Sequence, residues 1–229
     1  LFEKVGIETT FVGHPLANKI PLKSNMFKYR KMFNLGRKEL VIALLPGSRM
    51  GELKAHTDTL LETAQNLLEV HPDAKFLIPA TNDNNVHFIK SRIRNNPTKN
   101  LKLIKGKVDE ILSSANIAIA ASGTASLQIA LHKKPMIIIY KGSWISYFIW
   151  KMVRLIPNVS LPNILLNENF VPEMLQHRAT PYLLSEKACE IIKDKKYLKK
   201  IESKFNKLHK DLKKNTSSLI FKIIKPYLK

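Results

Sequence analysis

Apolar and polar positions follow two different periods along this chain. Short continuous apolar runs, of the length that buried strands have, are separated by longer segments in which apolar residues recur every three or four positions, as on one face of a helix. Strands that are apolar on both faces and each lead into a helix are typical of a doubly wound parallel sheet. The pattern therefore predicts an α/β, Rossmann-like fold, with strands at residues 40–45, 75–79, 101–104, 117–121 and 136–140.

The amphipathic segments between these strands predict the helices. Segment 158–176 carries prolines without a regular period and is expected to be irregular, and a short strand is expected at 10–12. His14, which follows that strand and precedes Pro15, is interpreted as a hydrogen-bonded structural residue, with a role as a base left open. The predicted helices cover residues 51–70, 84–95, 108–114 and 124–132, and further helices run from about residue 181 to the end.

The turn after the fourth predicted strand is the most informative segment. In doubly wound sheets, ligands bind outside the carboxyl ends of the strands, so the loops after Leu45, Ala121 and Tyr140 are the first places to look. Small residues at 122–126 lead from a strand into a helix, where free amides and the helix dipole favour a diphosphate. The candidate residues here are Ser122, Gly123, Thr124, Ala125 and Ser126, with Gln128 one turn later and able to reach ribose hydroxyls. The alternative is an ordinary strand-to-helix turn capped by Ser122 or Thr124.

A second turn with similar chemistry follows the first predicted strand. Residues 44–52 read LLPGSRMGE, a strand end, a tight Pro-Gly turn and a helix start. Arg49 can bind a phosphate or carboxylate with its planar guanidinium, and Ser48 can cap the helix or donate to a ligand. Glu52 suits the helix N-terminus and needs no function there. Two anion-competent turns at one edge of a sheet favour a shared phosphate site.

A third segment, residues 141–157, combines aromatic and basic side chains around a helical circumference. Aromatic rings beside Lys and Arg suit the headgroup level of a bilayer, and the alternative is a core helix with two cations that reach solvent. The candidate membrane or acyl-chain contacts are Trp144, Tyr147, Phe148, Trp150, Lys151 and Arg154.

Charge and cysteine content limit the classes of function. The formal net charge is +20, and residues 187–229 hold 14 Lys against four acidic residues. This excess indicates an anionic partner or a solvated helical face. A nucleic-acid-binding module is the rival interpretation, but the basic stretch lacks interleaved aromatics and any recognisable binding motif. The single cysteine, Cys189, excludes an intramolecular disulfide and favours a reducing compartment.

Several other sites and segments are not expected. Seven histidines show neither HExxH nor HxH spacing, so we predict no metal site, and no cofactor is assigned. The longest uncharged run, 111–132, is too polar for a membrane span. The first residues do not resemble a signal peptide and Leu1 is not a natural start, so we expect a truncated chain.

Six short motifs in this order resemble bacterial lipid-A-disaccharide synthases, over essentially the whole chain. The resemblance implies the C-terminal portion of a GT-B glycosyltransferase, with an N-terminal domain of roughly 150 residues or more missing. The motifs are VGHPL at 12–16, LLPGSR at 44–49, ASGTASL at 121–127, KPM at 134–136, SLPNIL at 160–165 and VPEMLQ at 171–176.

The resemblance also implies an activity and a set of contacts. The family transfers a 2,3-diacylglucosamine unit from UDP to 2,3-diacylglucosamine 1-phosphate, with inversion and without a metal. The 122–126 turn, Gln128, Ser48, Arg49 and Asn163 are then expected around UDP. The resemblance also implies that the catalytic base and much of the acceptor site are to be expected in the N-terminal domain, so no residue here is assigned as base and the chain alone is expected to be inactive. Another GT-B enzyme, a peptidoglycan lipid-linked transferase or a UDP-sugar epimerase, is the alternative, which the LPGSR and SLPN motifs disfavour.

Two positions depart from the family pattern. Asn18 stands where the family usually has Asp, and Gln128 where it usually has Glu. A glutamine carbonyl still accepts from a hydroxyl, so we expect an altered ribose contact and not its loss.

The resemblance implies three parts and a location. Residues 1–35 are expected to end the N-terminal domain and form the linker, 36–185 to bind the UDP-sugar, and 186–229 to form helices that pack back toward the N-terminal domain. We expect a cytoplasmic protein, peripheral on the anionic inner membrane of a Gram-negative bacterium. The resemblance also implies a homodimer through the C-terminal elements.

Overall fold

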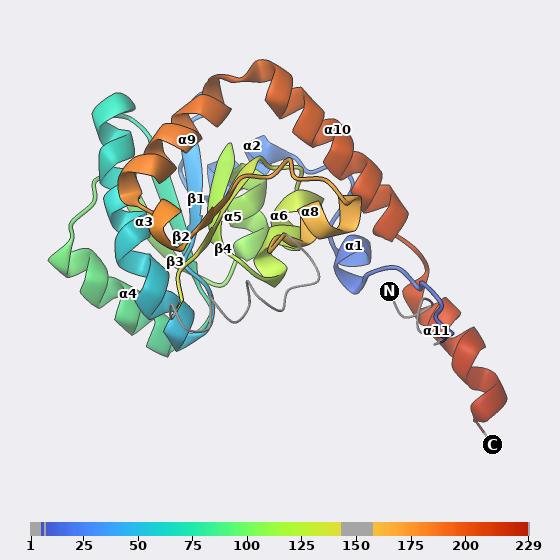
Figure 1. The fold of residues 1–229 in the computed structure, drawn as a ribbon. Helices are drawn as coiled ribbons and strands as arrows, with labels where there is room; N and C mark the ends of the chain where they lie inside the picture. The colour runs from blue at the N-terminus through green and yellow to red at the C-terminus, as the bar shows by residue number, and fades with distance from the viewer. Residues whose placement is uncertain (1–5, 7, 143–157, 229) are drawn as a thin grey trace.

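The chain folds around one parallel sheet of six strands. The computed structural model describes residues 6, 8–142 and 158–228. The strands lie in the order β3-β2-β1-β4-β5-β6, which confirms the doubly wound sheet predicted from the apolar runs (Figure 1). They are β1 (Val41–Leu45), β2 (Lys75–Ala80), β3 (Leu101–Lys105), β4 (Ile117–Ala121), β5 (Met136–Tyr140) and β6 (Glu173–Leu175).

The two central strands explain why the apolar runs are continuous. Every residue of β1 and β4 is buried, because both faces of the sheet are covered. Ile42 and Leu44 pack into the core on one face, while Val41, Ala43 and Leu45 pack into the core on the other. The chain reverses its direction of strand addition between β1 and β4, so the crevice at their carboxyl ends is the switch point of the sheet.

Helices cover both faces of the sheet (Figure 1). One face carries α3 (Met50–Val70), α4 (Asp83–Asn95) and α9 (Pro181–Lys193). The other carries α1 (Pro15–Lys19), α5 (Val108–Ser114), α6 (Thr124–Leu131), α8 (Leu161–Leu166) and α10 (Lys195–Leu212), while α2 (Met26–Met32) contacts α5.

Two predictions about local structure were wrong. Segment 158–176 is not irregular throughout, because it forms α8 and then β6, which pairs in parallel with β5. β6 has only three residues, too few to show a period in the sequence. No strand forms at 10–12. The chain there leads to His14, whose amide donates to the carbonyl of Leu212 and whose Nδ1 accepts from the amide of Leu16, as expected of a structural histidine.

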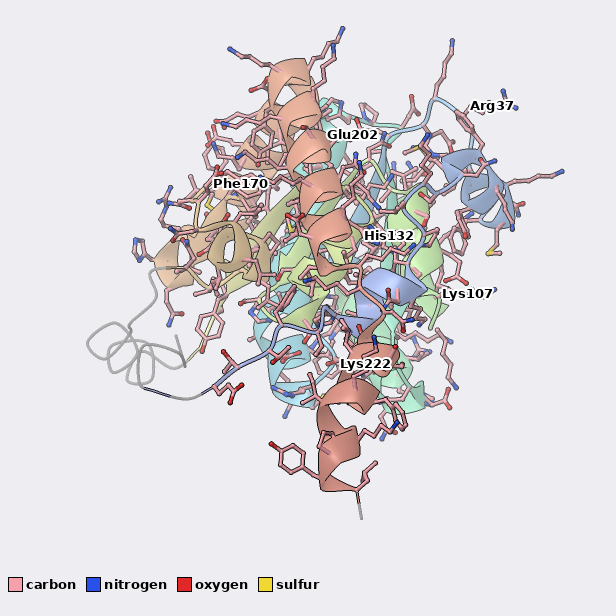
Figure 2. All side chains as sticks on the ribbon, turned by 90° about the vertical axis from the view of Figure 1, so that its right-hand side faces the viewer. Arg37, Lys107, His132, Phe170, Glu202 and Lys222 are labelled. Atoms are coloured by element: carbon pink, nitrogen blue, oxygen red, sulfur yellow. The ribbon has the colours of Figure 1, made fainter. Side chains whose placement is uncertain are left out.

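The long helix α10 lies over the helices of the second face. Ile201, Phe205 and Leu208 on one stripe of α10 are buried, and α10 contacts α6 and α1. Figure 2 shows α10 in front, with His132 and Lys107 to one side of it and Phe170 to the other. Short 3-10 turns lie at Gln176–Arg178 and Lys225–Tyr227. The last helix, α11 (Thr216–Ile224), extends away from the body of the protein (Figure 1), and its apolar side chains Ile220, Phe221, Ile223 and Ile224 are exposed. The division of the chain at residues 35 and 185 stays a prediction.

Candidate functional site

A cleft of about 330 Å³ opens at the switch point of the sheet. Loops after β1 and β4 line it together, which confirms that the two anion-competent turns share one cavity. Pro79, Thr81 and Val108 from the ends of β2 and β3 also line the cleft, although the sequence did not single them out. Of the predicted UDP contacts, those that line it are Ser48, Arg49, Ser122, Gly123, Thr124, Ala125 and Gln128.

The first turn of α6 presents free amides to this cleft. Gly123 has a φ of 143°, a conformation that favours glycine, and a Cβ there would meet nothing within 4 Å. No described residue takes a backbone hydrogen bond from the amides of Gly123, Thr124 or Ala125. The start of a helix that faces open space with unpaired amides is suited to an anion.

The alternative of a simple capped turn does not describe α6. Its N-cap residue is Gly123, which has no side chain, and Ser122 donates its hydroxyl to the carbonyl of Val159. Ser126 is fully buried; its hydroxyl donates to the carbonyl of Gly123 and accepts from the amide of Leu161. Ser126 therefore holds α8 against α6 and does not line the cleft.

The turn after β1 is closed by an internal carboxylate. Oε2 of Glu52 accepts from the amides of Ser48 at 2.8 Å and Arg49 at 3.2 Å, so the helix-capping role expected for Glu52 is confirmed. Gly47 has a φ of 115°, and a Cβ at this position would collide with Glu52. The amides of Ser48 and Arg49 are thus already paired, and this turn offers a ligand the guanidinium of Arg49 and the hydroxyl of Ser48.

Arg49 stands at the edge of the cleft with its side chain 87% exposed. Its only described ion pair joins Nη1 to Oε1 of Glu52 at 3.8 Å, a weak contact at an exposed site. The guanidinium is therefore able to turn toward an anion in the cleft at little cost.

Gln128 lies one helical turn after the free amides, and its side chain is hydrogen-bonded to α5. Its Nε2 donates to Oδ1 of Asp109 on α5 at 2.6 Å. Gln128 lines both the cleft and the neighbouring hollow beside α1, and Asp109 lines only that hollow.

Asn163 lies outside the cleft lining and is fully buried. Its Nδ2 donates to the carbonyl of Val171 and to Oε1 of Glu173, and its Oδ1 accepts from the amides of Phe170 and Val171. Both hydrogens and both lone pairs of the amide are used inside the protein. The contacts of Asn163 are those of a residue that shapes the chain between α8 and β6.

The sequence did not identify His56, which links the turn after β1 and the start of α3 to the loop after β5. Its Nδ1 donates to the carbonyl of Glu52 at 2.8 Å, and its Nε2 accepts from the amide of Lys141 at 3.0 Å. Burial lowers the pKa of His56, so the ring remains neutral in the tautomer that both bonds require. A histidine among apolar positions of α3 was the only signal, because its partners are distant in sequence.

The aromatic and basic residues proposed for membrane contact, Trp144, Tyr147, Phe148, Trp150, Lys151 and Arg154, lie outside the described residues. Within the described ranges, the helices are each too short or too polar to cross a bilayer. The same ranges hold no group of three or more histidine, cysteine or acidic side chains placed to bind a metal ion.

Comparisons with known proteins identify relatives over almost the whole chain. The family model described as lipid-A-disaccharide synthetase matches residues 1–224. A lipid-A-disaccharide synthase of Dechloromonas aromatica is 38% identical over 95% of this chain, and one of Aromatoleum aromaticum is 37% identical over all of it. The chain spans 58% and 59% of the lengths of these two relatives.

Solved structures share the fold at low sequence identity. The crystal structure of an Anabaena protein in complex with UDP and glucose has a TM-score of 0.60 at 13% sequence identity. The match covers 94% of this chain and 55% of the Anabaena chain. The low identity limits this likeness to the fold, which is that of GT-B glycosyltransferases.

Proposed function

We propose that this chain, which belongs to the lipid-A-disaccharide synthase family, forms the donor-nucleotide half of a glycosyltransferase. The reaction joins UDP-2,3-diacylglucosamine to 2,3-diacylglucosamine 1-phosphate, which gives the lipid A disaccharide 1-phosphate and UDP. The substrates are lipid A precursor sugars, and the family membership favours this reaction over a UDP-sugar epimerase or a peptidoglycan transferase.

One observation carries the proposal: the free amides of Gly123, Thr124 and Ala125 face the same cleft as the guanidinium of Arg49. A diphosphate in the cleft accepts from these amides, and the helix dipole of α6 adds roughly 0.3–1 kcal/mol. Arg49 binds the outer phosphate oxygens with charge-assisted hydrogen bonds. The donor is thereby held at the carboxyl ends of the strands.

The same groups assist the chemical step. When the acceptor hydroxyl displaces the diphosphate at the anomeric carbon, negative charge grows on the departing UDP. The amides of α6 and the guanidinium of Arg49 neutralise that charge without rearrangement, which lowers the barrier. No described residue is assigned as the general base, which we place in the part of the family's length that this chain does not span.

Arg49→Ala tests the donor site directly. We expect UDP to bind roughly ten times more weakly, since one charge-assisted contact is lost, with titration calorimetry as the measurement. Gly123→Val is expected to weaken UDP binding as well, because a branched side chain is strained at this φ and projects into the cleft.

Two controls match these changes. Arg37→Ala removes another exposed arginine that does not line the cleft, and Gly51→Ala adds a methyl group on α3 where nothing lies within 4 Å. Both are expected to bind UDP as the wild type does. If Arg49→Ala binds UDP as tightly as Arg37→Ala, the proposed site is wrong.

We also propose that the protein works at the anionic inner-membrane surface, on its cytoplasmic side. The acyl chains of both proposed substrates require access to lipid, and the aromatic and basic residues 144–154 suit the headgroup region. This part of the proposal rests on the sequence of that segment.

A further inference from the structure

Beside the cleft, a partly buried polar network converges on one carboxylate. Oδ1 of Asp109 accepts from Nε2 of Gln128 at 2.6 Å and from Nε2 of His132 at 3.0 Å. Nδ1 of His132 lies 3.2 Å from the hydroxyl of Ser113, and Nζ of Lys19 lies 3.6 Å from Oδ2 of Asp109. The network thus ties α5, α6 and α1 together directly beside the cleft.

The charge on Asp109 decides which way the amide of Gln128 is turned. The hydrogen bond from His132, followed by that from Gln128, holds the pKa of Asp109 at about 2, against the cost of burial. An ionised carboxylate only accepts, so Gln128 must point its NH₂ group toward Asp109. The carbonyl oxygen of Gln128 is then the polar atom left over, and no described residue donates to it.

The position of Gln128 places that oxygen beyond the diphosphate site. Residues 124 and 128 are four positions apart on α6, about 6 Å along the helix axis. In a nucleoside diphosphate, the ribose follows the phosphates. A carbonyl acceptor one turn past the free amides of α6 therefore meets ribose hydroxyls when the diphosphate is bound.

We propose that Asp109 is a positioning residue of the donor site, which fixes the carbonyl oxygen of Gln128 as the acceptor for a ribose hydroxyl of a nucleoside diphosphate. The inference rests on the proposed function, because it requires UDP in the cleft. His132 assists by donating to the same oxygen atom of Asp109 from the C-terminal end of α6. An amide at position 109 cannot do this reliably, because it presents either an oxygen or an NH₂ group and leaves Gln128 free to turn over.

The test compares UDP with 2′-deoxy-UDP and 3′-deoxy-UDP by titration calorimetry. The wild type is expected to bind UDP roughly three to ten times more tightly than the analogue that lacks the accepted hydroxyl. Asp109→Asn and Gln128→Ala are each expected to bring this ratio close to one. The double variant is expected to bind no more weakly than Gln128→Ala alone, because Asp109 acts through Gln128.

A charge swap separates positioning from a general loss of structure. Gln128→Glu sets two carboxylates against each other and is expected to weaken UDP binding. Adding Asp109→Asn restores a donor opposite the new carboxylate, and we expect the preference for UDP over the deoxy analogue to return. Glu110→Gln is the matched control, since it removes the neighbouring carboxylate of α5, which makes no described hydrogen bond or ion pair.

The possible results distinguish the two proposals. If the wild type does not bind UDP, the proposed function is wrong and this inference is overturned with it. If the wild type prefers UDP to a deoxy analogue and Asp109→Asn keeps the same preference, the role of Asp109 is overturned alone. Additive losses in the double variant, or no rescue by the charge swap, also overturn it.

Discussion

Lys134 shows how a single buried charge shapes the pH dependence of folding. Its side chain lies just before β5, with 8% of the residue exposed, and no described residue forms a hydrogen bond or ion pair with its ammonium. Burial, assisted by the nearby charge of Arg30, lowers the pKa of Lys134 to about 8 from an ordinary value of 10.5. The charged form is therefore disfavoured in the folded protein.

This shift predicts that the protein is more stable in mild alkali. Between pH 8 and 10.5, the unfolded chain keeps the proton on Lys134 while the folded chain releases it, so the free energy of unfolding rises with pH. Lys134→Met is expected to raise that free energy by roughly 1–3 kcal/mol at pH 7, and to reduce the rise toward pH 9.5.

Urea denaturation at pH 7 and 9.5 measures the effect, with Lys90→Met on the exposed face of α4 as the control. Equal behaviour of the two variants would contradict the prediction.

At the scale of elements, one carboxylate holds residues 159–163 against β6. Oε1 of Glu173 on β6 accepts from the amide and hydroxyl of Ser160 and from Nδ2 of Asn163, and its Oε2 accepts from the amide of Val159. These bonds join the SLPN and VPE motifs. The motifs are therefore explained by the placement of β6 and α8 at the edge of the sheet.

Asn163→Ala is expected to destabilise the fold by roughly 2–4 kcal/mol, because it leaves buried polar partners on Val171 and Glu173 without hydrogen bonds. Asn84→Ala, at an exposed position of α4 whose side chain makes no described hydrogen bond, should change the free energy of unfolding by less than about 0.5 kcal/mol. Urea denaturation distinguishes these outcomes. Titration of the folded Asn163→Ala variant with UDP is a second measurement, and we expect the affinity for UDP to be unchanged. A large loss of affinity would instead support a direct contact between Asn163 and the nucleotide.

At the scale of the whole molecule, the positive charge is carried largely by solvated helix faces. α10 buries Ile201, Phe205 and Leu208 on the side that contacts α6 and α1, and most of its lysines are exposed on the other side. Lys204, which is half-buried, pairs with Glu168. An amphipathic helix with this pattern needs no nucleic acid to account for its charge.

Membrane binding is the whole-molecule prediction that depends on residues 144–154. Changing Trp144, Phe148 and Trp150 together to Ser is expected to reduce partition onto vesicles that contain anionic lipid, while UDP affinity stays intact. Sedimentation with vesicles of mixed neutral and anionic phospholipid measures the partition. Changing Phe11, Phe27 and Tyr182, which are exposed elsewhere, to Ser provides the control. If the first variant partitions onto the vesicles as strongly as the wild type does, the proposed membrane contact of residues 144–154 is wrong.

The sequence by itself determined five of the six strands of the sheet, most of the helices and the two turns that face the cleft. Continuous apolar runs report burial on both faces, and Gly123 marks a backbone conformation that other residues rarely adopt. These are local properties, so they can be recognised within a window of a few residues.

Only the tertiary structure decided which polar groups are free and which are already paired. Glu52 accepts from the amides of its own turn, and the amide of Asn163 is fully paired with Phe170, Val171 and Glu173. Asp109 orients Gln128 from a position 19 residues away in the chain. Strand β6 likewise exists because β5 offers it an edge. A hydrogen bond depends on a partner brought close by folding, and no local pattern of residues identifies that partner.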